Sequence, residues 1–113
     1  MPPKPPQLAE FELLVLLAAL RLGSEEAYTV SIADHIERKT GRPVRRANVY
    51  TTLQRLEAKK LVTTRLGESR PERGGKPRRL VSVLPIGLAA VRATTGAIRA
   101  MVVEVGDVIG ETT

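Results

Sequence analysis

Apolar side chains recur every three or four positions in four segments of the chain, which is the spacing of one face of an α-helix. This pattern predicts helices over residues 8–22, 29–40, 46–60 and 86–109. Between the third and the fourth helix, two short runs rich in β-branched or aliphatic residues flank a stretch containing glycine and proline. Residues 61–66 and 79–84 are therefore expected to form the two strands of a β-hairpin.

The second and third helices carry further signals in their sequences. The hydroxyl of Thr29 can cap the start of the second helix, and Gly41 can end it in the left-handed conformation. The inner stripe of the third helix is expected to consist of Val49, Tyr50, Leu53 and Leu56. This helix is expected to lie between a short connector, residues 42–44, and the first strand.

The first and last helices have more apolar surface than one small domain can cover. The first helix has one apolar stripe containing Phe11 and Val15 and a second on another side, so we expect the second stripe to meet another subunit. In the last helix, apolar positions alternate at spacings of three and four, as in paired helices. The predicted dimer interface consists of Leu13, Leu16, Leu17, Leu20, Val91, Ile98, Met101, Val105 and Val108.

The order of the elements is three helices, a strand, a turn, a second strand and a final helix. This order is typical of the winged helix-turn-helix, in which the third helix can enter the major groove of DNA and the hairpin, or wing, can touch the neighbouring backbone. The predicted fold class is mainly α with a small β-hairpin: a winged helix-turn-helix domain plus a C-terminal dimerisation helix. We expect a disordered N-terminal arm over 1–7, the DNA-binding domain over 8–84, the dimerisation helix over 85–109 and a frayed tail over 110–113.

The positive charge of the chain is concentrated in its middle. The 113 residues carry a net charge of +6. Residues 38–79 hold 14 basic and three acidic side chains, whereas the rest of the chain holds four basic and nine acidic ones. A basic block on one folded unit suits a polyanion, so double-stranded DNA is the leading partner.

Two segments of this block supply candidate DNA contacts. If the third helix buries its apolar stripe, its opposite side is polar, with groups that can bond to base edges or phosphates. A solvated helix face is the ordinary interpretation of such a pattern, but the basic block and the hairpin favour DNA. The candidates on this helix and at its start are Arg45, Arg46, Asn48, Thr51, Thr52, Arg55 and Lys59. Those in the wing are Arg70, Arg73, Lys76 and Arg78.

The composition argues against other classes of protein. With no cysteine and a single histidine, His35, the chain has no residues for thiol catalysis, a catalytic triad or a histidine-rich metal site. We therefore expect no enzymatic activity, no metal and no cofactor. The longest uninterrupted apolar run has eight residues, and Glu10 and Glu12 precede it, so neither a membrane span nor a signal peptide is expected. The expected location is the cytoplasm.

Several stretches resemble the PadR-like transcriptional regulators. They are Phe11-Glu-Leu-Leu-Val-Leu-Leu-Ala-Ala-Leu, Glu26-Ala-Tyr, Thr40-Gly-Arg, Val49-Tyr-Thr-Thr-Leu-Gln-Arg-Leu-Glu, Leu61-Val and Pro71-Glu-Arg-Gly-Gly, and they cover most of residues 8–87. The resemblance implies a bacterial repressor that binds an operator as a homodimer, with the C-terminal helix pairing across subunits. It also implies that Tyr50 contacts the DNA backbone, while core burial remains the alternative.

The chain departs from the family pattern at two helix ends. Arg45 stands where the family usually has serine, which removes a side-chain cap and adds a phosphate-binding charge. Lys60 replaces a usual glycine after the third helix, and a left-handed backbone there would cost about 1 kcal/mol.

The expected function is sequence-specific DNA binding by a homodimer at a palindromic site. The alternative is a winged-helix adapter that binds protein or RNA through the same basic face. Some members of the family sense small aromatic molecules between subunits, but the aromatic residues of this chain are Phe11, Tyr28 and Tyr50, all outside the last helix. The sequence therefore does not support an effector of that kind.

Overall fold

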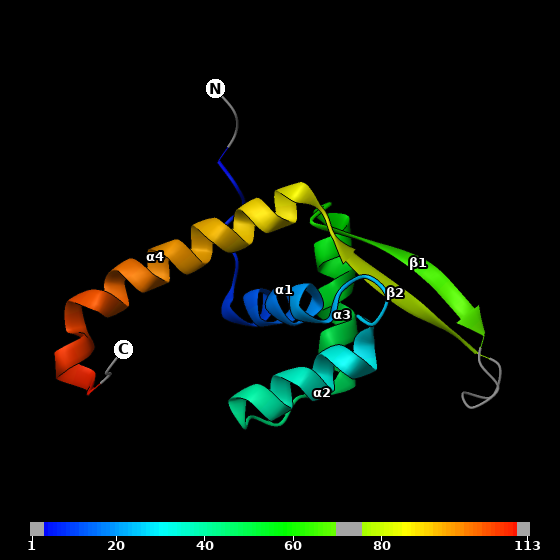
Figure 1. The fold of residues 1–113 in the computed structure, drawn as a ribbon. Helices are drawn as coiled ribbons and strands as arrows, with labels where there is room; N and C mark the ends of the chain where they lie inside the picture. Colours follow the sequence, from blue (N-terminus) through cyan, green and yellow to red (C-terminus); the bar gives the residue numbers. More distant parts are fainter. Residues whose placement is uncertain (1–3, 70–75, 111–113) are drawn as a thin grey trace.

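The computed structural model describes residues 4–69 and 76–110 as a bundle of helices with a hairpin on one side. Figure 1 shows α1, α2 and α3 packed together, the hairpin projecting to one side and α4 extending to the other. The molecule measures 52 × 39 × 20 Å. The elements are α1 (Glu10–Leu22), α2 (Thr29–Thr40), α3 (Arg46–Ala58), β1 (Val62–Ser69), β2 (Pro77–Val83) and α4 (Pro85–Ile109). The predicted class, mainly α with a small β-hairpin and a C-terminal helix, is confirmed, whereas the pairing of that helix across subunits stays a prediction.

The hairpin strands are longer than predicted, and α3 is shorter. The antiparallel register pairs Val62 with Val83 and Thr64 with Val81, and it becomes irregular between Leu66 and Ser69. The strands continue into polar residues because their pairing rests on backbone hydrogen bonds, which do not depend on the polarity of the side chains. At the other boundary, α3 ends at Ala58, and Lys60 adopts a left-handed φ of 63° that turns the chain toward β1.

The α2 helix ends as predicted but begins differently. Gly41 has a left-handed φ of 73°, and its N–H donates to the Glu37 carbonyl, which confirms the predicted terminator. The predicted cap by Thr29 is wrong, because Tyr28 occupies the cap position and its N–H donates to Ser31 Oγ at 3.0 Å. A serine three residues into the helix therefore provides the side-chain hydrogen bond at this end.

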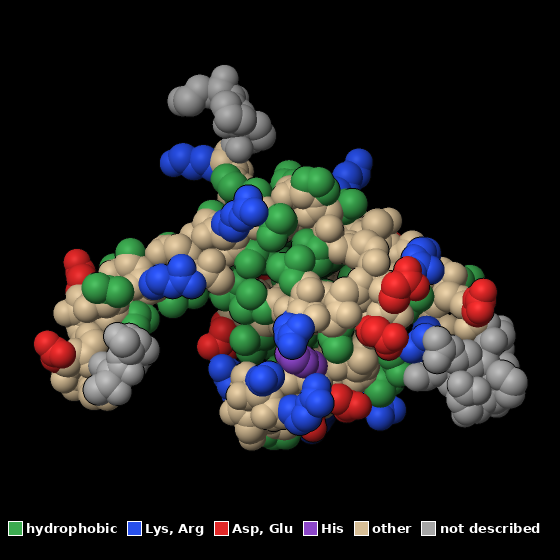
Figure 2. All heavy atoms as spheres, viewed as in Figure 1, with side chains coloured by type: hydrophobic (Ala, Val, Ile, Leu, Met, Phe, Trp, Pro, Cys, Tyr) green, Lys and Arg blue, Asp and Glu red, His purple; other side chains and the backbone are tan. Residues whose placement is uncertain are grey.

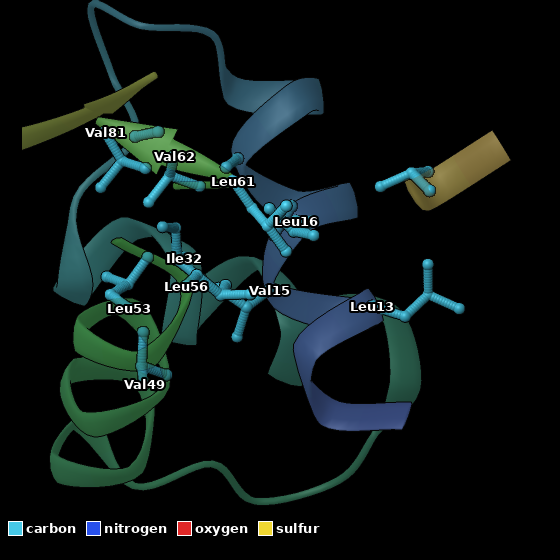
Figure 3. Packing of buried hydrophobic residues seen from close by; sticks show 14 of the residues in the cluster. Leu13, Val15, Leu16, Ile32, Val49, Leu53, Leu56, Leu61, Val62 and Val81 are labelled. Carbon is cyan, nitrogen blue, oxygen red and sulfur yellow. The ribbon is translucent and has the colours of Figure 1, made fainter. Parts of the chain in front are cut away.

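The core forms where the three helices meet the base of the hairpin (Figure 3). Val81 N–H donates to the Ala27 carbonyl at 2.8 Å, which attaches β2 to the segment between α1 and α2. Burying each large apolar side chain contributes roughly 1.5–3 kcal/mol. The largest fully buried apolar side chains are those of Val15, Leu16, Ile32, Val49, Leu56, Leu61, Val62 and Val81.

The all-round apolar surface of α1 is covered largely by its own chain, because α1 contacts α2, α3, β2 and α4. Leu13 is 6% exposed and Leu16 is fully buried, so their predicted place in a dimer interface is wrong. Val91 is also corrected: it is 5% exposed, in the part of α4 that packs on the core. Only Leu17 and Leu20 of the predicted α1 residues keep substantial exposure, 40% each.

Most of α4 projects beyond the core with apolar side chains exposed. Among the described residues, it is the one helix long and apolar enough to cross a membrane by length and composition, with a mean hydropathy of 1.4 over its best stretch. The expectation of no such segment considered only uninterrupted apolar runs. Apolar helices of soluble proteins meet the same criterion, so this is weak evidence for a membrane. Ile98, Met101, Val105 and Val108 of the predicted interface are all exposed.

Replacing Lys60 with glycine is expected to stabilise the protein by about 1 kcal/mol, because a Cβ is unfavourable at a left-handed φ. Urea unfolding at equilibrium measures the difference. Lys60→Ala is the matched control, since it removes the same side-chain charge but keeps the Cβ. Equal gains in the two variants would mean that the charge, and not the backbone, sets the cost.

Candidate nucleic-acid interface

One side of α3 presents polar and basic groups without apolar side chains between them. Asn48, Thr51 and Arg55 are exposed, and Arg45 and Arg46 are exposed at the helix start. No side-chain hydrogen bond caps α3 at Arg45, as the departure from the family pattern predicted. Asn48 and Arg55 lie seven residues apart, which is two helical turns, so both point to the same side of the helix. Their amide and guanidinium groups can reach base edges in a major groove.

Thr52 does not belong to this surface. Its side chain is 1% exposed, so its predicted place on the polar side is wrong. It follows Val49 by three residues and precedes Leu56 by four, and these spacings put all three side chains on the inner side of the helix. Its hydroxyl accepts a hydrogen bond from Arg55 Nη2 at 3.3 Å, so Thr52 helps to position the guanidinium of a candidate contact.

Tyr50 lies on the outside of α3 and not in the core. Its side chain is 53% exposed, which corrects its place in the predicted inner stripe and leaves the phenol accessible to a partner. Gln54, one turn later, donates from Nε2 to the Tyr50 hydroxyl at 3.3 Å. The two residues border a hollow of about 300 Å³ between α3, the start of α2 and the hairpin. Its lining residues are Thr29, Tyr50, Leu53, Gln54, Glu57, Thr64, Arg79 and Val81.

The sequence-based candidate set omitted Gln54 and Arg79, which the fold brings to this hollow. Arg79 donates to Thr64 Oγ1 at 3.1 Å across the hairpin, and Thr64 donates to Glu57 Oε2 at 2.8 Å. The helical spacing from Tyr50 could have identified Gln54, since residues four apart are neighbours on a helix. No sequence signal pairs Arg79 with α3, because that proximity comes from the docking of the hairpin.

The wing candidates have three different outcomes. Arg70 and Arg73 lie outside the described residues. Lys76 is exposed. Arg78 is 9% exposed, so its expected place on an open loop is wrong. Strand alternation puts Arg78 on the same side as the buried Leu80, toward the segment that joins α1 and α2.

The buried guanidinium of Arg78 is held within the protein. It lies 5.1 Å from the centre of the Tyr28 ring, and its Nη1 is 3.8 Å from Glu26 Oε2. Within the described residues, its Nε has no hydrogen-bond partner. Arg78 therefore attaches the start of β2 to the segment between α1 and α2 and does not extend into solvent.

Lys59 is engaged by a carboxylate on another helix. Its Nζ lies 2.9 Å from Glu12 Oε2, and the Glu12 side chain is only 7% exposed. The other Glu12 oxygen accepts the Ala9 N–H at 2.9 Å. Burial alone would raise the pKa of Glu12, but the bonds from Lys59 and Ala9 outweigh it, and the pKa lies below its ordinary value of 4.5. Lys59 thus joins α3 to α1, which reduces its availability to DNA.

The Glu12 carboxylate is expected to make folding stability depend on pH in the acid range. Because its pKa is lower in the folded state, the contribution is complete above the unfolded value near 4.5 and is lost as the pH falls through the folded value. Urea unfolding of wild type and Glu12→Gln, measured between pH 7 and pH 3, should show a stability difference that shrinks below pH 4.5. Glu104→Gln, which removes an exposed carboxylate of α4 that forms no ion pair in the described residues, is the control. A pH-independent difference for Glu12→Gln would contradict the assignment.

The remaining charges leave the start of α3 strongly positive. Exposed ion pairs engage Arg42 with Glu10 and Arg65 with Glu25, each at 2.9 Å. Over residues 4–69 and 76–110, no carboxylate pairs with Arg45, Arg46 or Arg55. The same part of the chain contains no group of three His, Asp or Glu residues placed to hold a metal ion. The arrangement therefore offers unpaired cations and hydrogen-bonding groups for a polyanion.

Known proteins share this architecture. A PadR family transcriptional regulator from Eggerthella lenta is 24% identical, with a TM-score of 0.66 over 88% of this chain and 86% of its own. The protein TA0346 from Thermoplasma acidophilum is 12% identical, with a TM-score of 0.68 over 89% of this chain and 94% of its own. A comparison with curated proteins found no match.

The structural likenesses, at these identities, concern the fold. The sequence itself gives the assignment, because residues 16–92 match the family described as "Transcriptional regulator PadR-like family". The match extends from α1 through the hairpin into the first turns of α4, and so includes every described element of the candidate interface. The chain belongs to the PadR-like family of transcriptional regulators.

Proposed function

We propose that this protein represses transcription by binding a palindromic DNA site as a homodimer in the cytoplasm, with no enzymatic activity, metal or cofactor of its own. Residues 8–84 form the DNA-binding unit, and residues 85–109 form the pairing helix. The observation that carries the proposal is the exposed polar side of α3, where Asn48, Thr51 and Arg55 lie beside the unpaired Arg45 and Arg46. In this position α3 enters the major groove.

The contacts divide into two roles. Asn48 and Arg55 read base edges, since an amide suits adenine and a guanidinium suits guanine. Arg45, Arg46, Tyr50, Gln54, Arg79 and the wing residue Lys76 contact the sugar-phosphate backbone, which fixes the register of the protein on the duplex. Arg70 and Arg73 of the wing add to the same backbone contacts. Thr52 and Arg78 are not part of this proposal because both are buried.

The homodimer rests on the apolar surface that the monomer exposes. Ile98, Met101, Val105 and Val108 follow the alternating spacing of a helix-pairing stripe, and they are between 42% and 83% exposed. Leu17 and Leu20 add exposed apolar surface on α1. A twofold dimer would place two α3 helices about 34 Å apart and read a palindrome. Occupation of such a site in a promoter would exclude the polymerase, so repression is the expected outcome.

Alanine at Asn48 or Arg55 is expected to reduce discrimination between the preferred DNA site and random duplex by about 1–3 kcal/mol, because each side chain can make a paired contact to one base. Selection of duplexes from a random pool supplies the site, and titrations of both duplexes with wild type and each variant measure the loss. Arg92→Ala, an exposed change on α4, is the control.

The outcomes also separate the rival function. Unchanged discrimination in variants that still fold would mean that the exposed polar side of α3 is ordinary solvated surface and does not read DNA. If selection yields no preferred duplex and the protein binds RNA or another protein tightly, the protein is an adapter and not an operator-binding regulator. A promoter reporter carrying the selected site tests the direction of regulation, and increased transcription would contradict repression.

A further inference from the structure

A second basic cluster lies on α1 and α2, away from the candidate DNA contacts. It surrounds a hollow of about 580 Å³, within the size range of small-molecule sites. The lining side chains all come from α1, α2 and the segment between them: Arg21, Leu22, Glu26, Ser31, His35, Arg38 and Lys39. In Figure 2, blue basic side chains gather around the purple histidine over α2. In Figure 1, α3 lies behind these helices.

The spacing along α2 explains how the cluster forms. Ser31, His35 and Arg38 follow one another at intervals of four and three residues, so they occupy one side of the helix. The neighbouring positions Ile32 and Ile36 are buried and fix α2 against the core. Arg21, in the last turn of α1, approaches from the opposite side of the hollow. A packed pair of helices therefore holds the cationic groups.

The cations of this cluster have no carboxylate partners in the described part of the chain. None of the ion pairs there includes Arg21, Arg38 or Lys39. Arg38 Nη2 lies 3.3 Å from His35 Nδ1, a contact between two side chains of the same cluster. The lining carboxylate, Glu26, lies beside Arg78 instead. Three like charges held near each other without a counter-ion form a site for an anion.

The neighbouring acidic groups of α2, Asp34 and Glu37, form no ion pair with the cations of this site in the described part of the chain. Glu37 directs Oε1 to the Val44 N–H at 2.7 Å, on the connector to α3. Asp34 lines an adjoining hollow with Glu37 and Arg38. Burial, followed by the charges of Arg38, Lys39 and Arg21, lowers the pKa of His35 below 6.5. The imidazole is therefore mostly neutral at pH 7, because burial and the surrounding positive charges both disfavour its protonated form.

We propose that this hollow between α1 and α2 binds a small polyanion bearing several phosphate or carboxylate groups. Arg21, Arg38 and Lys39 pair with its negative charges, and Ser31 and His35 contribute hydrogen bonds. None of its lining residues is a candidate DNA contact, so the two sites share no side chain. Glu37 adjoins Arg38 in sequence and holds the connector that leads to Arg45, which links the site to the start of α3.

His35 makes the test site-specific, because it is the only histidine of the chain. Pyrophosphate, citrate and sodium chloride are added to the full-length protein at matched ionic strength while NMR follows the His35 imidazole. We expect a saturable shift with pyrophosphate or citrate, and a higher His35 pKa at saturation because an adjacent anion stabilises the imidazolium. Preference for one probe identifies the phosphate or the carboxylate class.

Variants decide whether the named cations form the site. Arg21→Gln with Lys39→Gln is expected to weaken binding about tenfold or more, since charge-assisted hydrogen bonds are lost. Arg92→Gln, which removes an exposed cation of α4, should bind like wild type. Equal responses to sodium chloride, or equal affinity in both variants, would overturn the proposal by showing charge screening or binding elsewhere. A His35 shift produced only by duplex DNA would overturn it as well, by assigning the cluster to DNA.

Discussion

The double variant Ile98→Glu with Met101→Glu is expected to be monomeric and to bind a palindromic site about 10²–10⁴-fold more weakly than wild type. Both side chains lie on the exposed alternating stripe of α4, at 49% and 67% exposure. Pairing two such helices would bury the new carboxylates without partners, which is costly. A monomer then binds each half-site separately and loses the advantage of linked binding. Light scattering gives the mass, and DNA titration gives the affinity.

Val103→Glu provides the matched control for this prediction. Val103 is also exposed on α4, at 75%, but it lies two residues from Met101 and therefore on another side of the helix. It should remain dimeric. Circular dichroism should show folded protein in all variants, because α4 packs on the core through Gly87, Ala90 and Val91 near its start. A monomeric wild type at micromolar concentration would refute the proposed dimer.

Gly87→Ala is expected to destabilise the protein by about 1–3 kcal/mol, because the position has no room for a methyl group. A Cβ there would overlap the Leu61 carbonyl oxygen and lie 3.0 Å from Val83 Cγ1. The Leu84 N–H donates to the same Leu61 carbonyl at 2.9 Å, so α4 begins directly against the turn between α3 and β1. Relief of the overlap requires α4 to move away from the core.

Gly96→Ala separates this contact from the general effect of glycine in a helix. Gly96 lies in the exposed part of α4, and a Cβ there would meet nothing within 4 Å. Alanine at this position should stabilise the protein by up to about 1 kcal/mol through helix propensity alone. Urea unfolding of both variants measures the two effects. Changes of the same sign would mean that the close approach at Gly87 does not limit stability.

Local sequence signals were sufficient for the elements and for their order. Helical and strand periodicities depend on neighbours within a few residues, so the four helices, the hairpin and the left-handed Gly41 could be predicted. The exposed polar side of α3 followed from the same periodicity, since Val49, Leu53 and Leu56 fix which side is buried. The prediction was wrong for Thr52, because this residue was assigned to the exposed side for its polarity. Its spacing from Val49 and Leu56 places it on the buried side.

Interactions between distant segments could not be predicted in this way. An all-round apolar α1 fits either a second subunit or several elements of its own chain, and tertiary packing buries Leu13 and Leu16 within the monomer. The position of Arg78 depends on the docking of β2 beside Ala27, which brings the guanidinium over Tyr28. The pairing of Lys59 with Glu12 joins two residues 47 positions apart in the sequence, which no local spacing indicates.

The sequence by itself determined the winged helix-turn-helix class, the basic middle of the chain and the polar side of the third helix. Each of these depends on residue type and short-range spacing, which the chain carries before it folds. The tertiary structure alone decided which charges remain free, because ion pairing and burial depend on distances between segments. It buries Arg78 beside Glu26 and pairs Lys59 with Glu12, so neither charge is free. It also brings Gln54 and Arg79 to one hollow and Arg21, Arg38 and Lys39 to another.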